Sequence, residues 1–190
     1  MKKTCLAALL AAIVSAPAFA QSPSFNYVEA SYFDADGIDG VSLSLVREIA
    51  DNFVFLGDLS YGTDSFMGVD IDVTTLSAGV AYRYAINEET AFVVGPQLLY
   101  ARAKTSGSFN GFDVSGSDSE TGFGVVGMVR HMAAEQVEFN AGLQHVNFSD
   151  YSSTDPFIGA RIHLNQQFSL SASYSFDDAD TISFGVAYHF

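Results

Sequence analysis

The chain has 190 residues, of which 48% are hydrophobic, and it carries a formal net charge of −14 with one cysteine. The apolar content argues against a disordered acidic chain, and the negative charge argues against nucleic acid as a partner. The single cysteine, Cys5, excludes an intramolecular disulfide and a zinc site built from several cysteines.

Residues 1–20, MKKTCLAALLAAIVSAPAFA, have the pattern of a secretory signal peptide. Two lysines precede an apolar run at 6–14, and an A-x-A cleavage pattern follows at 18–20. The run is too short for a membrane-spanning helix. We therefore predict export and one mature domain at 21–190. Loss of two of the eight basic residues leaves six against 22 acidic residues, a net charge of −16 and no cysteine.

Along the mature chain the dominant hydrophobic period is two, which is typical of strands with one apolar face. The fourth of ten candidate strands slips by one residue near Thr75, which we interpret as a β-bulge. Merging either of the two weakest segments, 41–47 or 157–164, would give eight strands instead. The ten segments are 28–32, 41–47, 53–61, 73–84, 92–100, 123–129, 137–143, 157–164, 168–176 and 182–190.

Short turns alternate with longer connections along the chain. Acidic or amide-rich turns followed by an aromatic strand start recur at Ala50, Asn87, Ala134 and Asn165, which indicates repeated hairpins. Between them lie connections rich in Gly, Ser and Asp, such as 63–70 and 105–120. Outer-membrane barrels have short periplasmic turns and longer outer loops. The pattern therefore predicts an all-β, antiparallel up-and-down transmembrane β-barrel.

The alternative is a soluble barrel or sandwich with its apolar face turned inward. Its opposite face would then meet water and should be rich in Lys, Glu and Thr, but here it carries small residues such as those at 169, 171, 173 and 175. Small side chains suit a narrow barrel interior. Aromatic residues also mark both strand ends, as the two interfacial girdles of a membrane barrel require: Phe53, Phe92, Phe139 and Phe168 at one, and Tyr61, Tyr100 and Tyr174 at the other.

The chain ends in FGVAYHF, in which Phe184, Val186, Tyr188 and Phe190 share the apolar face. With the N-terminal signal pattern and the alternating hairpins, the mature chain resembles the OmpA/OmpX-like small outer-membrane barrels. This resemblance implies location in the outer membrane of a Gram-negative bacterium, and a C-terminal signal of these four residues for the barrel-assembly machinery. The start FNYVEASYF, followed by D-x-D-G at 34–37, is also similar to small secreted barrels discussed as quorum or immunity factors.

Strand parity places three acids and three arginines on the inward face, near the short turns. A charge in a confined lumen is costly unless it is paired, and an arginine fork can hold a carboxylate at two points. We interpret these residues as an ion-pair network that plugs the lumen. The alternative is a narrow ion path that opens when partners exchange. The six residues are Glu29, Asp58, Arg83, Arg130, Glu138 and Arg161.

The outer rim combines two basic residues with many acids. Arg102 and Lys104 share the outward parity of Tyr100, and we predict that they contact outer-membrane lipid and lipopolysaccharide. The acids suit divalent cations but complete no calcium-binding loop, so a solvated acidic rim is favoured over cation bridges to lipid phosphates. The acids assigned to outer loops or rims are Asp34, Asp36, Asp39, Asp64, Asp70, Asp72, Asp113, Asp118, Glu120, Asp150, Asp155, Asp177, Asp178 and Asp180.

The histidines are the candidate residues for a lipid-hydrolysing site. Only His145 approaches the outer leaflet, and the nearby Ser149 has the opposite parity. The sequence has no G-x-S-x-G, phosphate loop or metal-binding histidine spacing. We predict a monomeric, non-enzymatic barrel without a cofactor, in a structural or surface-interaction role. A narrow pore and, less favoured, a lipid hydrolase are the alternatives.

Overall fold

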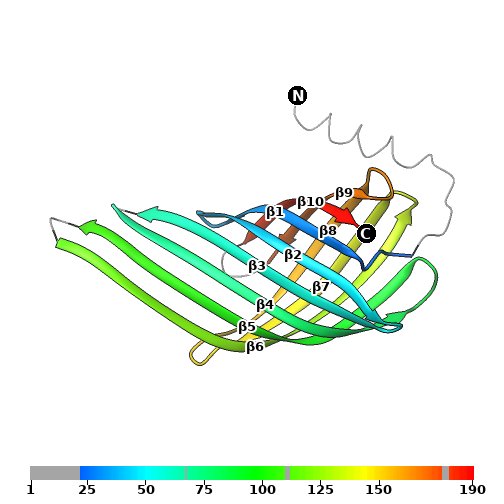
Figure 1. Ribbon diagram of the computed structural model, residues 1–190, viewed down its shortest axis with the longest axis horizontal. Coiled ribbons are helices and arrows are strands. Elements are labelled where there is room, and N and C mark those ends of the chain that lie inside the picture. Colours follow the sequence, from blue (N-terminus) through cyan, green and yellow to red (C-terminus); the bar gives the residue numbers. More distant parts are fainter. Residues whose placement is uncertain (1–21, 67, 110–111, 177–179) are drawn as a thin grey trace.

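The computed structural model describes residues 22–66, 68–109, 112–176 and 180–190, which form ten strands (Figure 1). Each strand pairs antiparallel with the next, and β1 closes on β10, so the sheet is a closed barrel. The prediction of ten strands is confirmed over that of eight. The strands are β1 (Tyr27–Ala35), β2 (Ile38–Ala50), β3 (Phe53–Phe66), β4 (Val69–Ala85), β5 (Thr90–Phe109), β6 (Phe112–Ala134), β7 (Val137–Asn147), β8 (Ser152–His163), β9 (Phe168–Ser175) and β10 (Thr181–His189).

The predicted signal peptide lies outside the described residues. No helix in the described part of the chain is long and apolar enough to cross a membrane.

The apolar face of the wall points outward. Leu98 is 73% exposed, whereas Val54 and Val93, of the opposite parity, are fully buried inside the barrel. Alternation of side chains along each strand produces this division. Other outward residues that are large, apolar and exposed include Leu43, Leu59, Tyr61, Leu76, Val80, Tyr100, Phe123, Val125, Phe139, Ile158, Phe168, Leu170, Phe184, Val186 and Tyr188.

The bulge predicted near Thr75 is wrong. β3 and β4 pair without interruption from Phe53↔Tyr82 to Phe66↔Val69, so Val73 faces the side opposite Leu76. The register shifts lie instead at Glu48/Ala50 and Met132/Ala134, each beside a short turn.

The strands reach different heights at the end opposite the short turns (Figure 1). The β1–β2 ladder ends at Ala35↔Ile38, where Asp36 and Gly37 form a two-residue turn with positive φ angles of 48° and 99°. Such a turn matches the right-handed twist of a hairpin. The β5–β6 ladder, in contrast, runs on to Phe109↔Phe112.

The connections predicted as loops at 63–70 and 105–120 are mostly strand, so that prediction is wrong. Residues 63–73 and 101–122 of β3–β6 extend past the shorter strands, and we call this part the protruding sheet. Its β6 edge pairs with β7 only from Phe123 onward. Several acids assigned to loops or rims therefore lie in strands, namely Asp34, Asp39, Asp64, Asp70, Asp72, Asp113, Asp118, Glu120 and Asp155. Asp177 and Asp178 lie outside the described residues.

Candidate functional site

Two buried ion pairs lie side by side inside the barrel, near the short turns. Arg130 on β6 binds Glu138 on β7 in a fork, with Nε to Oε1 at 2.6 Å and Nη2 to Oε2 at 3.0 Å. Arg130 is 4% exposed and Glu138 is fully buried. Arg161, the cross-strand partner of Glu138, forms an ion pair with Glu29 on β1. A forked, charge-assisted pair is among the strongest polar contacts in proteins.

The third arginine of the predicted network has its acidic partner outside the set of six residues. Arg83 on β4 forms an ion pair with Glu48 on β2, and its Nη2 donates to the carbonyl oxygen of Asp51 at 2.8 Å. Asp58 instead accepts a hydrogen bond from Ser44 Oγ at 2.6 Å. Glu48 has the inward parity of Ser44, but it lies one residue past the predicted strand end at residue 47 and is therefore absent from the predicted set.

Two aromatic rings fill the spaces between the three arginines. Phe25 lies with its ring centre 4.5 Å from the guanidinium carbon of Arg130 and 5.2 Å from that of Arg83. The ring centre of Tyr27 lies 5.5 Å from the guanidinium carbon of Arg130 and 4.1 Å from that of Arg161. These are cation–π distances. The three arginines and the two rings alternate in a row that crosses the lumen from β4 to β8. We call this row the arginine–aromatic layer.

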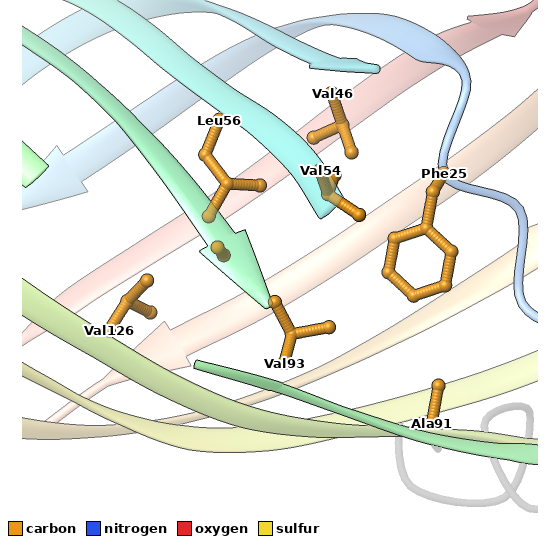
Figure 2. Packing of buried hydrophobic residues seen from close by; sticks show 8 residues of the cluster. Phe25, Val46, Val54, Leu56, Ala91, Val93 and Val126 are labelled. Carbon is orange, nitrogen blue, oxygen red and sulfur yellow. The ribbon is translucent and has the colours of Figure 1, made fainter. Parts of the chain in front are cut away.

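Phe25 belongs to a buried apolar cluster inside the barrel, as Figure 2 shows. It is 3% exposed and comes from the segment before β1, where no strand period signals its position. The rest of the cluster comes from the inward faces of β2 to β6. Its other buried members are Val46, Val54, Leu56, Ala81, Ala91, Val93 and Val126.

Hydrogen bonds fix the segment that carries Phe25. Ser22 Oγ donates to the carbonyl oxygen of Glu88 at 2.9 Å, in the turn between β4 and β5. Asn26 accepts at both its oxygens: the side chain from Glu48 N at 3.1 Å, and the backbone carbonyl from Phe190 N at 3.2 Å. The segment is therefore tied to three separate parts of the barrel end.

Two histidines continue the layer toward β10. His189 Nε2 lies 2.8 Å from Ser169 Oγ, and its ring centre lies 5.1 Å from that of His163 and 5.4 Å from that of Tyr27. His163 Nε2 is 3.6 Å from Glu138 Oε2. Both histidines thus have the inward positions that strand parity predicted.

Two cavities lie on opposite sides of this layer. One, of about 280 Å³, is lined by Phe25, Glu29, Arg161, Ser44 and Ser173 among others, and we call it the inner chamber. The other, of about 290 Å³, is lined by residues near the short turns, including Ser22, Ser24, Glu135, His163 and His189, and we call it the mouth cavity. Within the described part of the chain, the two share no lining residue.

Hydroxyl groups line the lumen beyond the layer. Ser60 Oγ lies 2.6 Å from Thr75 Oγ1, and Ser173 Oγ lies 2.6 Å from Ser183 Oγ. Ser171 Oγ donates to Glu29 Oε1 at 2.7 Å. This part of the lumen is polar, in contrast to the apolar cluster around Phe25.

The two basic rim residues are exposed on the protruding sheet. Arg102 lies beside Ser117, with its Nε and Nη2 at 3.4 and 3.3 Å from the hydroxyl oxygen. Lys104 pairs across the strands with Asp72, which accepts a hydrogen bond from Tyr61 at 2.7 Å. The basic pair therefore sits next to acids of the same rim.

The structure gives His145 a neighbour other than Ser149. His145 Nδ1 lies 2.9 Å from Thr154 Oγ1 on β8. In the part of the chain that the structure describes, no group of three or more His, Cys, Asp or Glu side chains could hold a metal ion.

A match of the sequence to a family model and the closed barrel point to the same family. The family model for the outer membrane protein beta-barrel domain matches residues 6–190. The chain belongs to this outer-membrane β-barrel family. Its predicted fold class and its place in the outer membrane of a Gram-negative bacterium are thereby confirmed. In such barrels the short turns face the periplasm, so the arginine–aromatic layer lies at the periplasmic end.

Solved structures of similar fold include three small outer-membrane proteins. The KdgM porin has 13% sequence identity and a TM-score of 0.50, covering 86% of this chain and 99% of its own. Neisserial surface protein A has 17% identity and a TM-score of 0.48, covering 88% and 98%. Ail of Yersinia pestis has 17% identity and a TM-score of 0.47, covering 86% and 95%. A comparison with curated proteins gave no match.

Proposed function

We propose that this protein is a small monomeric barrel with a structural or surface-interaction role and a lumen closed at its periplasmic end. The observation that carries the proposal is the buried Arg130–Glu138 pair packed against Phe25. Separating such a pair leaves an uncompensated charge in a poorly hydrated space, which is strongly unfavourable. The resting lumen therefore conducts no ions in this account.

The protruding sheet is the proposed contact surface. Among the described residues, no strand pairs with the β6 edge from Asp113 to Gly122 on the side away from β5, and this edge carries Asp113, Asp118 and Glu120. A free edge can accept an added strand, while charges on it prevent unselective pairing. An extended, basic polypeptide segment is the partner that best fits both features.

Lipid and assembly contacts complete the proposal. Arg102 and Lys104 lie just beyond the aromatic Tyr100, where the phosphates of lipopolysaccharide would meet the wall. Phe184, Val186, Tyr188 and Phe190 are exposed on the outer face and would serve as the signal read by the barrel-assembly machinery. Replacing both Arg102 and Lys104 by alanine should weaken lipopolysaccharide binding, measured as lipid retained on the purified barrel. Equal retention would contradict the lipid assignment.

Single-channel recording in a planar bilayer tests the closed lumen. The proteins are the wild type, Arg130→Ala and Glu138→Ala, each extracted folded from outer membranes, with Lys104→Ala as a control outside the lumen. Silence from the wild type and the control supports a closed barrel. Steady wild-type openings that change with either lumenal substitution, but not with Lys104→Ala, would contradict it.

The second candidate is a narrow ion-conducting pore. The observation in its favour is the inner chamber of about 280 Å³ with serine hydroxyls and charged residues on its walls. Such a wall could replace part of the hydration shell of a small ion. The same recordings separate this candidate from the closed barrel.

A further inference from the structure

The segment Ser22–Asn26, here called the N-terminal plug, enters the lumen ahead of β1, and only its last residue, Asn26, bonds to the backbone beside β1. The ladders of β1 with both of its neighbours begin only at Tyr27. The plug is held by the Ser22 and Asn26 hydrogen bonds and by the packing of Phe25. Its attachment therefore consists of a few local contacts, whereas each wall strand is paired with two neighbours.

The ion pairs beside Phe25 stay within the wall. Arg83 pairs with Glu48, and Arg130 pairs with Glu138 on the adjacent strand, so neither pair uses an atom of the plug. Phe25 fills the space between the two guanidinium groups. Withdrawal of its ring would open that space without breaking an ion pair or a strand ladder.

We infer that the N-terminal plug is a displaceable gate, and that its withdrawal joins the mouth cavity to the inner chamber. This inference rests on the proposed closed lumen and names the part that closes it. The mouth cavity contacts the plug through Ser22 and Ser24, and the inner chamber contacts it through Phe25. The strands β6 and β8 also line both spaces, but they belong to the paired wall, whereas the plug precedes β1 and can move without unzipping a strand.

Recordings of Phe25→Ala test the gate. Truncation of a buried phenylalanine destabilises the closed state. The typical loss is large enough to raise the fraction of time that the barrel is open by roughly a hundredfold. Phe157→Ala is the matched control, because Phe157 packs against the same cluster and lines the inner chamber but is anchored in β8. Phe25→Leu, which keeps an apolar side chain, should give an intermediate open fraction and serves if the alanine variant folds poorly.

A disulfide lock tests displacement itself. Ser22→Cys with Glu88→Cys joins the plug to the β4–β5 turn at the point where Ser22 now donates a hydrogen bond. The only native cysteine, Cys5, lies in the predicted signal peptide, so the engineered pair has no competitor in the mature chain. We expect rare wild-type openings as the voltage is raised, none in the oxidised lock, and their return after reduction.

The outcomes separate the two proposals. A silent Phe25→Ala variant, or equal opening of Phe25→Ala and Phe157→Ala, would overturn the gate and leave the closed lumen standing. Openings that persist in the oxidised lock would also overturn it. A wild type that is steadily open at low voltage would instead overturn the closed lumen.

Discussion

The periplasmic half of the lumen and the protruding sheet belong to the same wall, yet they are built in opposite ways. In the first, charged, aromatic and aliphatic side chains pack together until Arg130 and Glu138 lose nearly all contact with solvent. In the second, β5 and β6 run on with exposed serines on their outward face and with Asp118 and Glu120 on the opposite face. The closed part of the lumen and the proposed contact surface lie at opposite ends of the barrel. A substitution in one region should therefore leave the other unchanged. Substitutions at matched chemical groups can test this separation.

The largest expected effect is at Glu138. Glu138→Ala leaves Arg130 as an unpaired buried charge, which should lower the free energy of unfolding by about 3–5 kcal/mol. Urea unfolding followed by gel mobility and far-UV circular dichroism measures this, since the chain has no tryptophan. A loss below about 1 kcal/mol would mean that the pair is hydrated and that the periplasmic half is not a packed core.

A glycine pair compares the two regions directly. A Cβ at Gly185 would lie 2.6 Å from Glu29 Oε1 and 2.6 Å from Ser31 Oγ, whereas one at Gly116 in the protruding sheet would meet nothing within 4 Å. Gly185→Ala should therefore cost about 1–3 kcal/mol in unfolding free energy, and Gly116→Ala less than about 0.5. Equal losses of unfolding free energy for the two variants in the same urea assay would mean that the two regions are packed equally tightly.

A weaker effect is expected at the partly exposed ion pair of Arg83 and Glu48. The side chains of Arg83 and Glu48 retain 24% and 34% of their accessible surface, so solvent screens their attraction. Glu48→Ala should reduce the unfolding free energy by about 0–1 kcal/mol, well below the effect of Glu138→Ala. Equal effects of the two substitutions would show that burial does not set the strength of these pairs.

The smallest effect on stability is expected at the β6 edge. Asp118→Asn with Glu120→Gln should change the unfolding free energy by less than about 0.5 kcal/mol, because both residues lie outside the packed core. The same double substitution removes charges that discourage edge pairing, so self-association should increase. Light scattering of the detergent-solubilised barrel measures it. An unchanged molecular mass would mean that these acids do not protect the edge.

The period-two pattern predicted much of the wall because each strand has one face toward lipid and one toward the lumen. The inward positions of Glu29, Arg130, Glu138 and Arg161 follow from parity alone. Pairing across the lumen does not, since it depends on strand tilt and register. The partner of Arg83, Glu48, was missed for another reason, because it lies just past the predicted end of its strand.

Two features carried no usable sequence signal. Phe25 precedes the first strand, and nothing in its spacing shows that its ring turns into the lumen. The residues at 105–120 have the Gly, Ser and Asp content of a loop, but antiparallel pairing satisfies their backbone groups in a long hairpin. Amino-acid composition therefore does not reveal a strand whose two faces both meet water.

The most direct test of closure is the reactivity of single cysteines on either side of the arginine–aromatic layer. Ser24→Cys lies in the mouth cavity and Ser173→Cys in the inner chamber. A charged thiol reagent is added to the periplasmic side of barrels inserted in one orientation. Rapid modification at position 24 with protection at position 173 is the predicted result, and similar rates at both positions would contradict a closed lumen.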